Sequence, residues 1–221
     1  MTRVKGESRA APRGANQPRD GVDGREARRL ATRQALAEAA IRLFDEHGFD
    51  ETTVDEIVAE VGVTSRTFFL HFATKAAAAF PDHEERMDSF RESLAARPEG
   101  MDVLLHLKQV MVAGITKSQT SRTRQQRYRL LTTVSALRDE DARTDRDYEL
   151  AIVDYLEPHW GSTPEARLRA NAVANVTMGV ARAALISWAV DGLNPGHSVD
   201  RLLGRLFGSP FDEPLHSLKR R

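Results

Sequence analysis

The stretch TTVDEIVAEVGVTSRTFFLHFATK, residues 52–75, decides the fold of the N-terminal part of this 221-residue chain. Thr53 is followed three residues later by Glu56, which is the spacing of a capping box at the start of a helix. Gly62 is expected to end that helix soon afterwards, and Thr64 can cap a second short helix. Two short helices joined by a glycine turn predict a helix-turn-helix, in which the second helix enters the major groove of DNA.

The side chains of the second of these helices suit contact with DNA. Its first turn carries short hydroxyls and one guanidinium group, and Arg66 is the kind of side chain that forks onto guanine. The apolar residues Phe68 and Phe72 are expected to pack on neighbouring helices. His71 follows, and Lys75 lies near the start of a fourth helix, where free backbone N–H groups would also attract a phosphate. On these residues alone, a small helical core with a solvated edge is an open alternative.

Residues 29–75 resemble the N-terminal domain of the TetR family of transcriptional regulators. The motifs that carry the resemblance are A-x-x-L-F-x-x-x-G-F in the first helix, T-T-V-x-x-I in the next, and G-V-[ST]-x-x-T-F-[YF]-x-H-F-x-x-K after them. The resemblance implies that bases are read by Ser65 and Arg66. It also implies phosphate contacts at five positions: Thr53, Thr64, Thr67, His71 and Lys75.

One position in the predicted DNA-binding helix departs from the family pattern. The family commonly has tyrosine where this chain has Phe69, and the tyrosine hydroxyl reaches a phosphate. Phenylalanine cannot donate that bond, so we expect Phe69 to contact DNA through apolar groups, such as a thymine methyl or a sugar. Leu70 also replaces what is often a polar residue.

The sequence divides into three parts. Residues 1–22 are rich in Gly, Pro, Ala and Arg and lack an apolar period, so we expect a disordered basic arm. Such an arm either touches phosphates or a minor groove, or is simply a solvated tail. Residues 23–75 form the predicted DNA-binding domain, its first helix opening with Asp23 and Glu26 as a capping box. By resemblance, residues 76–221 form an all-helical domain for effector binding and dimerisation.

The predicted fold class is all-α, with a three-helix DNA-binding domain followed by a larger helical domain. Eight to ten helices are expected, without an internal repeat. Thr163 and Pro164 predict the start of a long helix that ends near Asp191. The other helices expected after residue 75 cover about 101–116, 124–137, 148–156 (ended by Pro158), and Ser198 to Gly208.

The segment between the two predicted domains has an unusual composition. Lys75 is followed by four alanines, then Phe80 and Pro81. Alanine favours helix and leaves little bulk to lock the segment against its neighbours, whereas proline removes one helical hydrogen bond. One hypothesis is that an effector shifts this fourth helix and changes the separation of two DNA-reading helices. The other is that Pro81 only ends a helix, with a restart at Asp82.

The long helix from Pro164 to Asp191 is rich in alanine and glycine, which permits close approach of another helix. Together with the last helix it resembles the four-helix dimer seam of TetR-type proteins. A homodimer would bind a palindromic operator in double-stranded DNA. Packing of these helices within one subunit is the alternative.

The resemblance implies a small-molecule effector, and residues 126–156 weakly resemble the effector domain of TetR-type regulators that bind acyl-CoA-like ligands. An apolar or acyl-CoA-like effector is therefore expected. Aromatic and Met side chains beside a few polar groups are typical of ligand pockets, although ordinary packing is the alternative for each. The predicted ligand contacts are His106, Met111, Tyr128, Arg129 and Trp188, with Trp160 as a further candidate. A basic run either meets an anionic effector or forms a solvated face: Arg122, Arg124, Arg127 and Arg129.

Composition excludes several kinds of protein. The chain has no cysteine, so disulfides and thiolate metal sites are excluded. Its 32 basic and 32 acidic residues argue against non-specific coating of nucleic acid, so DNA contact requires a local patch. The most apolar stretch, residues 170–190, contains Asn171, Asn175 and Arg182, which would be costly in lipid. We therefore expect a cytoplasmic protein without a membrane partner.

Two other functions are alternatives to a DNA-binding regulator. An enzyme is disfavoured because the start of a zinc-protease motif at His83–Glu84 has Met87 where the second histidine is required. The sequence also lacks G-x-S-x-G, P-loop and dinucleotide motifs, so neither a catalytic residue nor a metal or cofactor is expected. The second rival is an all-helical lipid or acyl-CoA carrier without operator function. The favoured prediction is a ligand-responsive repressor, released from its operator by the effector.

Overall fold

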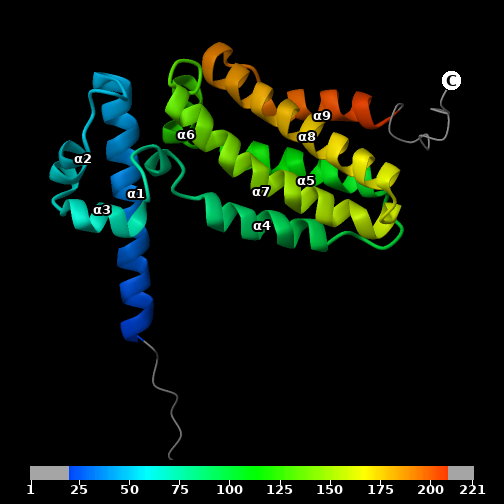
Figure 1. The fold of residues 1–221 in the computed structure, drawn as a ribbon, viewed down its shortest axis with the longest axis horizontal. Helices are drawn as coiled ribbons and strands as arrows, with labels where there is room; N and C mark the ends of the chain where they lie inside the picture. The colour runs from blue at the N-terminus through cyan, green and yellow to red at the C-terminus, as the bar shows by residue number, and fades with distance from the viewer. Residues whose placement is uncertain (1–19, 209–221) are drawn as a thin grey trace, which may run out of the picture.

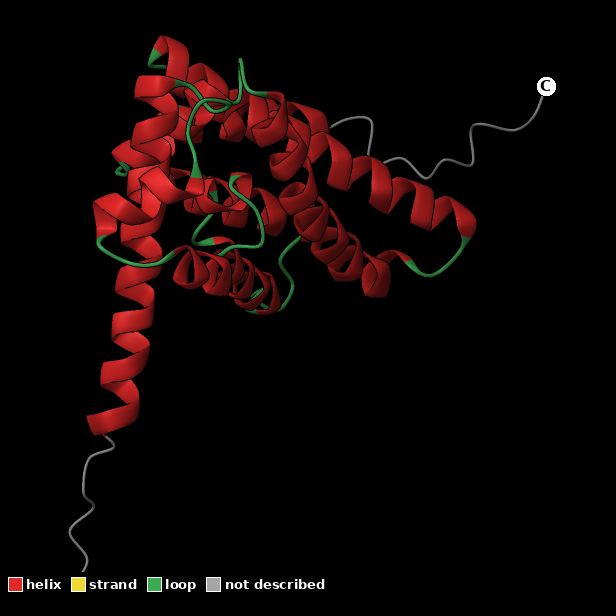
Figure 2. Ribbon diagram, turned by 60° about the vertical axis from the view of Figure 1, so that its left-hand side comes forward, coloured by secondary structure: helices red, strands yellow, loops and turns green. Residues whose placement is uncertain are grey.

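The computed structural model describes residues 20–208, with side chains from residue 24 onward. Most of the predicted arm over residues 1–22 therefore lies outside the described residues. The described part of the chain is helical and contains no strand, as the sequence predicts (Figures 1 and 2). Its elements are α1 (Asp20–His47), α2 (Val54–Val61), α3 (Ser65–His71), the 3-10 helix η1 (Ala76–Ala79), α4 (His83–Ala95), α5 (Val103–Ser118), α6 (Arg122–Leu130), α7 (Ser135–Trp160), α8 (Pro164–Asp191) and α9 (Pro195–Phe207).

The first three helices form the predicted helix-turn-helix. The capping box at the start of α2 is confirmed: the Thr53 N–H donates to Glu56 Oε2 at 2.7 Å and the Glu56 N–H to Thr53 Oγ1 at 3.2 Å. Gly62 ends α2 with φ of 73°, a left-handed conformation that a side chain would strain. Thr64 caps α3 by accepting from the Thr67 N–H. Buried side chains of all three helices share one core, with Phe44, Ile57 and Phe68 among them.

Helix α1 begins earlier than predicted. It starts at Asp20 rather than Asp23, so Asp23 lies inside the helix and does not cap it. Glu26, the expected partner in that cap, instead pairs with Arg29 at 2.7 Å. The first turns of α1 extend beyond the rest of the domain (Figure 1), and residues 25–31 are exposed.

The fourth helix expected from Lys75 does not form. Residues Ala76–Ala79 make a short 3-10 turn, and α4 begins only at His83. The expectation that alanines would leave this segment loosely held is also wrong, because Ala78 is fully buried and Phe80 is nearly so. Both α1 and α7 pack directly against the turn, and small side chains permit that close approach. Pro81 separates η1 from α4, and Asp82 is the N-cap residue of α4, which confirms the predicted helix restart at Asp82.

Helices α4 to α9 form the larger domain. The longest, α7 and α8, are joined by a short turn and pack side by side (Figure 1). Helices α5 and α9 also pack against each other. The predicted helix over 124–137 is wrong: the chain turns at residues 131–134 so that α6 can pack across α1 and α8. The predicted end before Pro158 is wrong as well, since α7 runs from Ser135 to Trp160. Pro158 lies in the last turn of α7, where its missing N–H costs a single helical hydrogen bond.

The two C-terminal helices begin at side-chain caps. Thr163 caps α8 as predicted, accepting from the Ala166 N–H at 3.2 Å. Helix α9 begins at Pro195 rather than Ser198, because Asn194 accepts from the His197 N–H at 2.9 Å and so provides the cap. By length and mean hydropathy alone α8 could cross a membrane. Its packing against α6, α7 and α9 is that of a central helix in a helical bundle.

Candidate nucleic-acid interface and buried cavity

Helix α3 presents one face to the core and the other to solvent. Phe68 and Phe72 are buried, whereas Arg66, Phe69 and Leu70 are exposed. The Phe69 ring packs edge-on against the Phe68 ring, with 5.4 Å between centroids, so the exposed ring is held in a fixed direction. The outward face of α3 therefore offers a guanidinium group and an apolar surface together.

The predicted hydroxyl contacts lie around the ends of α2 and α3. Thr53 and Thr64 hold the two helix caps, and Thr67 Oγ1 lies 3.0 Å from Thr64 Oγ1. Ser65 donates its hydroxyl to Asp55 Oδ1 at 2.6 Å, which joins α3 to α2. Each of these hydroxyls already has a local partner in the protein. Arg66, by contrast, has no hydrogen-bond or ion-pair partner among the residues whose side chains are described.

Lys75 and His71, two further predicted phosphate contacts, also interact with nearby groups of the protein. The Lys75 ammonium donates to the carbonyls of Phe49 at 2.5 Å and Thr52 at 2.6 Å. It also lies 4.2 Å from the centre of the Phe49 ring. Lys75 therefore ties the end of the helix-turn-helix to the loop between α1 and α2. Burial, together with the charge of nearby Arg33, lowers the pKa of His71, so its imidazole is neutral at neutral pH.

Arg33, on α1, connects the end of α3 to the joint between α3 and α4 (residues 72–82). Its Nε donates to the Pro81 carbonyl at 2.8 Å, and its Nη1 donates to the His71 carbonyl at the end of α3. The guanidinium carbon lies 4.4 Å from the centre of the Phe72 ring. No motif in the sequence marks Arg33 as a functional residue. The available signal was a basic side chain close to the buried positions of the first helix.

The larger domain contains a cavity of about 500 Å³ among α4, α5, α6, α7 and α8. Cavities of this size hold drug-sized ligands. Met111 and Tyr128, two of the predicted ligand contacts, line it. The other predicted contacts lie outside its lining: His106, Arg129 and Trp188, as does Trp160.

Three of these outlying residues have partners elsewhere in the protein. His106 Nε2 lies 3.0 Å from the Ser93 carbonyl, and Arg129 Nε donates to the Ala189 carbonyl at 2.6 Å. The ring of Trp160 lies under the guanidinium group of Arg169 at 4.1 Å.

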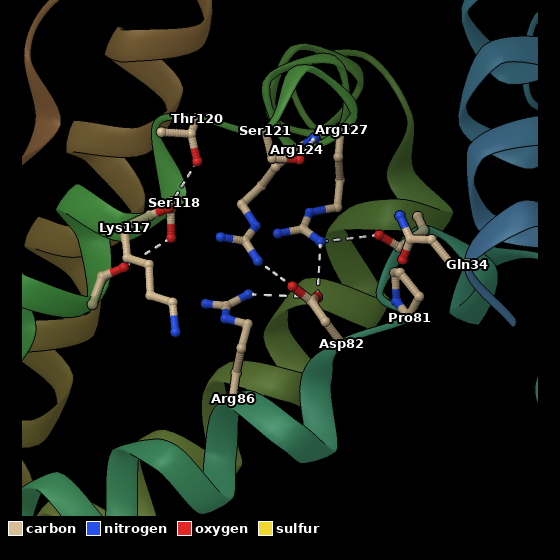
Figure 3. Close-up of polar contacts among 12 residues, drawn as sticks. Gln34, Pro81, Asp82, Arg86, Lys117, Ser118, Thr120, Ser121, Arg124 and Arg127 are labelled. Atoms are coloured by element: carbon tan, nitrogen blue, oxygen red, sulfur yellow. Dashed lines mark hydrogen bonds and ion pairs between the residues drawn. The ribbon is translucent and has the colours of Figure 1, made fainter. Parts of the chain in front are cut away.

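One end of the cavity holds a carboxylate among three guanidinium groups (Figure 3). Arg124 donates to Asp82 Oδ2, while Arg86 and Arg127 each place an Nη1 3.9 Å from Asp82 Oδ1. Burial by itself would raise the pKa of Asp82, but the three guanidinium charges outweigh it and lower the pKa. Asp82 is therefore ionised. Arg124 and Arg127 belong to the basic run that the sequence left open between an effector contact and a solvated face.

A second charged group lies on the opposite wall, where Arg182 of α8 meets two carboxylates of α7. Arg182 pairs with Asp145 and places its Nε 3.2 Å from Asp141 Oδ2. Burial and the neighbouring charge of Asp141 raise the pKa of Asp145 to about 6, although Arg182 opposes the shift. Burial also raises the pKa of Asp141. One carboxyl in this wall therefore changes its charge close to physiological pH.

The helix-turn-helix resembles known regulators in sequence. The sequence model of the family described as "Bacterial regulatory proteins, tetR family" matches residues 36–77. The HTH-type transcriptional regulator TcmR of Streptomyces glaucescens is 38% identical over 73 residues, which cover 33% of this chain and 32% of TcmR. The uncharacterized HTH-type transcriptional regulator YerO of Bacillus subtilis is 33% identical over 73 residues, covering 30% of this chain and 25% of YerO. The chain thus aligns with a third or less of the length of these two relatives.

The whole fold also resembles solved structures. NalD, the secondary repressor of the MexAB-OprM multidrug efflux pump in Pseudomonas aeruginosa, aligns with a TM-score of 0.58 and 20% identity, covering 82% of this chain and 96% of NalD. SmeT, solved in complex with triclosan, aligns with a TM-score of 0.58 and 16% identity, covering 86% of this chain and 99% of SmeT. FadR of Thermus thermophilus, a transcriptional repressor solved in complex with lauroyl-CoA, aligns with a TM-score of 0.51 and 20% identity, covering 86% of this chain and 96% of FadR. At these identities the likeness is one of fold.

Proposed function

We propose that this chain, whose residues 36–77 match the sequence model of the tetR family of bacterial regulatory proteins, is a ligand-responsive transcription repressor that binds a palindromic operator as a dimer. The observation that carries the proposal is the outward face of α3, which belongs to a well-capped helix-turn-helix and exposes Arg66 without a side-chain partner among the described residues. A guanidinium free of protein partners can fork onto guanine in the major groove. The effector releases the protein from DNA, and the protein acts in the cytoplasm.

In this proposal, DNA contacts follow the predicted assignment. Ser65 and Arg66 read bases, and Phe69 makes an apolar contact beside them. The hydroxyls at the helix ends stay close to their local partners while accepting a phosphate contact, since a hydroxyl both donates and accepts. Phosphates contact Thr53, Thr64, Thr67, His71 and Lys75. The domain division at residue 75 belongs to the same proposal.

A stripe along α8 supports a homodimer. Leu168, Asn175, Gly179, Ala183 and Val190 recur at helical spacing and are all exposed. A Cβ placed on Gly179 would meet no atom within 4 Å, so packing inside one subunit does not require glycine there. Small and apolar side chains in one exposed row allow a partner helix to approach closely. Leu202 extends the exposed apolar surface onto α9.

The cavity supports an effector site. Met111 and Tyr128 line it beside other apolar side chains, and charged groups lie at two of its walls. Neighbours of the same fold were solved with triclosan and with lauroyl-CoA, so this architecture accommodates small molecules in those proteins. The rival, a lipid or acyl-CoA carrier, would use the cavity without needing the exposed face of α3.

Selection of genomic fragments by the full chain tests the proposal. The wild-type protein should enrich a palindromic sequence whose half-sites lie about one helical turn of DNA, roughly 34 Å, apart. Arg66→Ala should weaken the enrichment and relax the selected sequence at one base pair of each half-site, whereas Arg91→Ala, a change at an exposed arginine of α4, should leave both unchanged. If the wild type enriches no sequence, or if Arg66→Ala enriches the same one equally well, the proposed function is wrong.

A further inference from the structure

The cavity end around Asp82 carries more positive charge than the protein neutralises. Arg86, Arg124 and Arg127 lie around one carboxylate, that of Asp82. Asp141 and Asp145, which also act on Arg86, already pair with Arg182, so four guanidinium groups face three carboxylates and one positive charge is left over. Figure 3 shows Arg86 rising from α4 and Arg124 descending from α6, with the Lys117 side chain directed toward the same space. Cations taken out of water are costly unless anions or hydrogen-bond acceptors face them. The charge balance at this end therefore favours an added anion.

Several donors of these guanidinium groups are unused. Arg86 donates no side-chain hydrogen bond to any residue in the described part of the chain, and its ion pair with Asp82 is long at 3.9 Å. Arg127 is buried, and its Nη1 donates to the Ala79 carbonyl at 3.0 Å, yet its Nε has no hydrogen-bond partner among residues 20–208. The guanidinium fork matches a carboxylate through two parallel hydrogen bonds. Arg86 and Arg124 together thus offer the donors that a second carboxylate requires.

The rest of the cavity is suited to an apolar group. Phe80, Phe90, Met111, Met178 and Leu185 line it. The volume of about 500 Å³ exceeds what a simple inorganic anion would fill. An acid with an apolar body would bury that body here while its charged end faces the guanidinium groups.

A cationic ligand fits the charges less well. The acidic groups available to it are Asp141 and Asp145, and Arg182 already pairs with both. Glu85 also lines the cavity, but it is exposed and belongs to the same helix as Arg86. A positive ligand would therefore have to separate an existing ion pair while facing the arginines around Asp82.

We infer that the effector is a small organic acid with an apolar body, and that Asp82 occupies the place of its carboxylate in the free protein. This inference rests on the proposed function, since it names the ligand class of the same effector site. The acid displaces Asp82 from Arg124 and Arg86. Asp82 immediately follows Pro81, whose carbonyl is held by Arg33, and Arg33 also holds the end of α3. Displacement of Asp82 therefore moves the Pro81 carbonyl, and through Arg33 it shifts the end of α3.

Two fluorescent probes with the same apolar body test the inference: 1-pyrenebutyrate, which is an anion, and 1-pyrenebutanol, which is neutral. Wild-type full-length protein should bind the anion about tenfold or more tightly than the alcohol, as expected for charge-assisted hydrogen bonds. Arg86→Met and Arg124→Met should abolish that preference. Asp82→Asn should increase it about tenfold, because the competing carboxylate is gone. Arg91→Met, an exposed arginine on the same helix α4, is the matched control and should leave the preference unchanged.

Each outcome of the probe measurements either supports or overturns the inference. Equal affinity for the two probes, or binding of neither, overturns the inference. So does a preference that survives both arginine substitutions. A misfolded variant cannot imitate the expected pattern, because Asp82→Asn and the arginine substitutions must change the preference in opposite directions. Selection of genomic fragments uses no ligand, so the proposed function can hold when this inference fails, and the probe measurements use no DNA.

Discussion

At the scale of single residues, Lys75 is the residue whose structural environment adds most to its predicted role. The sequence assigns it to a phosphate, while its ammonium donates to two carbonyls of the loop between α1 and α2. A charged group can serve both purposes, because the loop carbonyls fix its position and the charge still attracts a phosphate. Removal of the Lys75 ammonium should therefore destabilise the fold and also weaken DNA binding.

We expect Lys75→Ala to destabilise the protein by about 1–3 kcal/mol, the cost of leaving such acceptors without their charged donor. It should also weaken binding to all DNA sequences alike and lower the salt dependence of binding by about one phosphate contact. Denaturant unfolding and titrations at several salt concentrations measure the two effects. Arg66→Ala is the control, since its side chain has no partner in the described residues and should leave stability unchanged. Unaltered stability of Lys75→Ala would contradict its role in the loop.

Arg66 is expected to read a base rather than only hold the backbone. Arg66→Ala should cost about 1–3 kcal/mol of binding on the cognate site and relax preference at one base pair. Binding to a panel of operator point mutants measures this directly. If Arg66→Ala and Lys75→Ala show the same profile across the panel, the division into reading and positioning residues is incorrect.

Asp145 predicts a specific dependence of stability on pH. Burial raises its pKa from 3.8 to about 6, so the folded chain holds this proton more tightly than the unfolded chain. The stabilisation is fully present below about pH 4 and is lost as the pH rises through about 6. Relative to wild type, Asp145→Asn should therefore gain up to about 3 kcal/mol of unfolding free energy between pH 4 and pH 7.5.

Denaturant unfolding at a series of pH values checks the prediction for Asp145. The matched control is Asp88→Asn, which removes an exposed carboxylate of α4. Its difference from wild type should hardly change with pH. A constant difference between Asp145→Asn and wild type would show that the carboxyl titrates normally, despite Arg182, Asp141 and Glu149 around it.

At the scale of elements, α8 has two faces with different partners. One face is buried against α6, α7 and α9, and the other is the exposed stripe that includes Gly179. A glycine inside a helix costs about 0.5–1 kcal/mol relative to alanine, and nothing within one subunit requires it here. Close approach of a second subunit to α8 would explain why glycine stands at position 179.

Gly179→Leu should therefore weaken the dimer at least tenfold while leaving the stability of the monomer equal or slightly higher, since leucine favours helix. Sedimentation at a series of protein concentrations measures the first effect and circular dichroism the second. Ala142→Leu places the same side chain at an exposed position of α7 and should leave association unchanged. A dimer of unchanged affinity in Gly179→Leu would exclude this face of α8 as the interface.

At the scale of the whole molecule, the joint between the two domains is held by side chains rather than by a continuous helix. Arg127 donates to the Ala79 carbonyl and Arg33 to the Pro81 carbonyl, from α6 and α1 respectively. That an effector shifts the segment after Lys75 stays a prediction. In this structure the segment that would move consists of the joint and the start of α4. A ligand shifts it only as far as its affinity differs between the two arrangements.

Arg33→Met tests that coupling. We expect 1-pyrenebutyrate to bind this variant as it binds wild type, because Arg33 does not line the cavity. The factor by which the probe weakens operator binding should fall, because the contact between Pro81 and the end of α3 is lost. By linkage, operator DNA should weaken probe binding by that same factor. The measurement is probe titration with and without operator, with Arg91→Met as control. An undiminished factor in Arg33→Met would exclude this route.

Local sequence predicted those parts of the fold that depend on neighbouring residues. The caps at Thr53, Thr64 and Thr163 and the left-handed turn at Gly62 were foreseen, because each depends on side chains within a few positions of the helix end. The motifs of residues 29–75 were sufficient to predict the helix-turn-helix, and the sequence model of the tetR family matches residues 36–77 of this segment. The face of α3 that points outward also follows from its short apolar pattern.

The remaining helix boundaries and the cavity depend on tertiary packing. The break between α6 and α7, the continuation of α7 through Pro158 and the 3-10 turn at Ala76–Ala79 depend on which helices pack together, and packing overrides local preference. The cavity gathers Arg86, Arg124 and Arg182 from three separate helices, so no short motif marks it. The helix-turn-helix could be predicted from the sequence alone, since the caps and the glycine turn that form it are local. How α3 is linked to a charged cavity was decided by long-range contacts between α1, the joint and α6, which no spacing along the chain reveals.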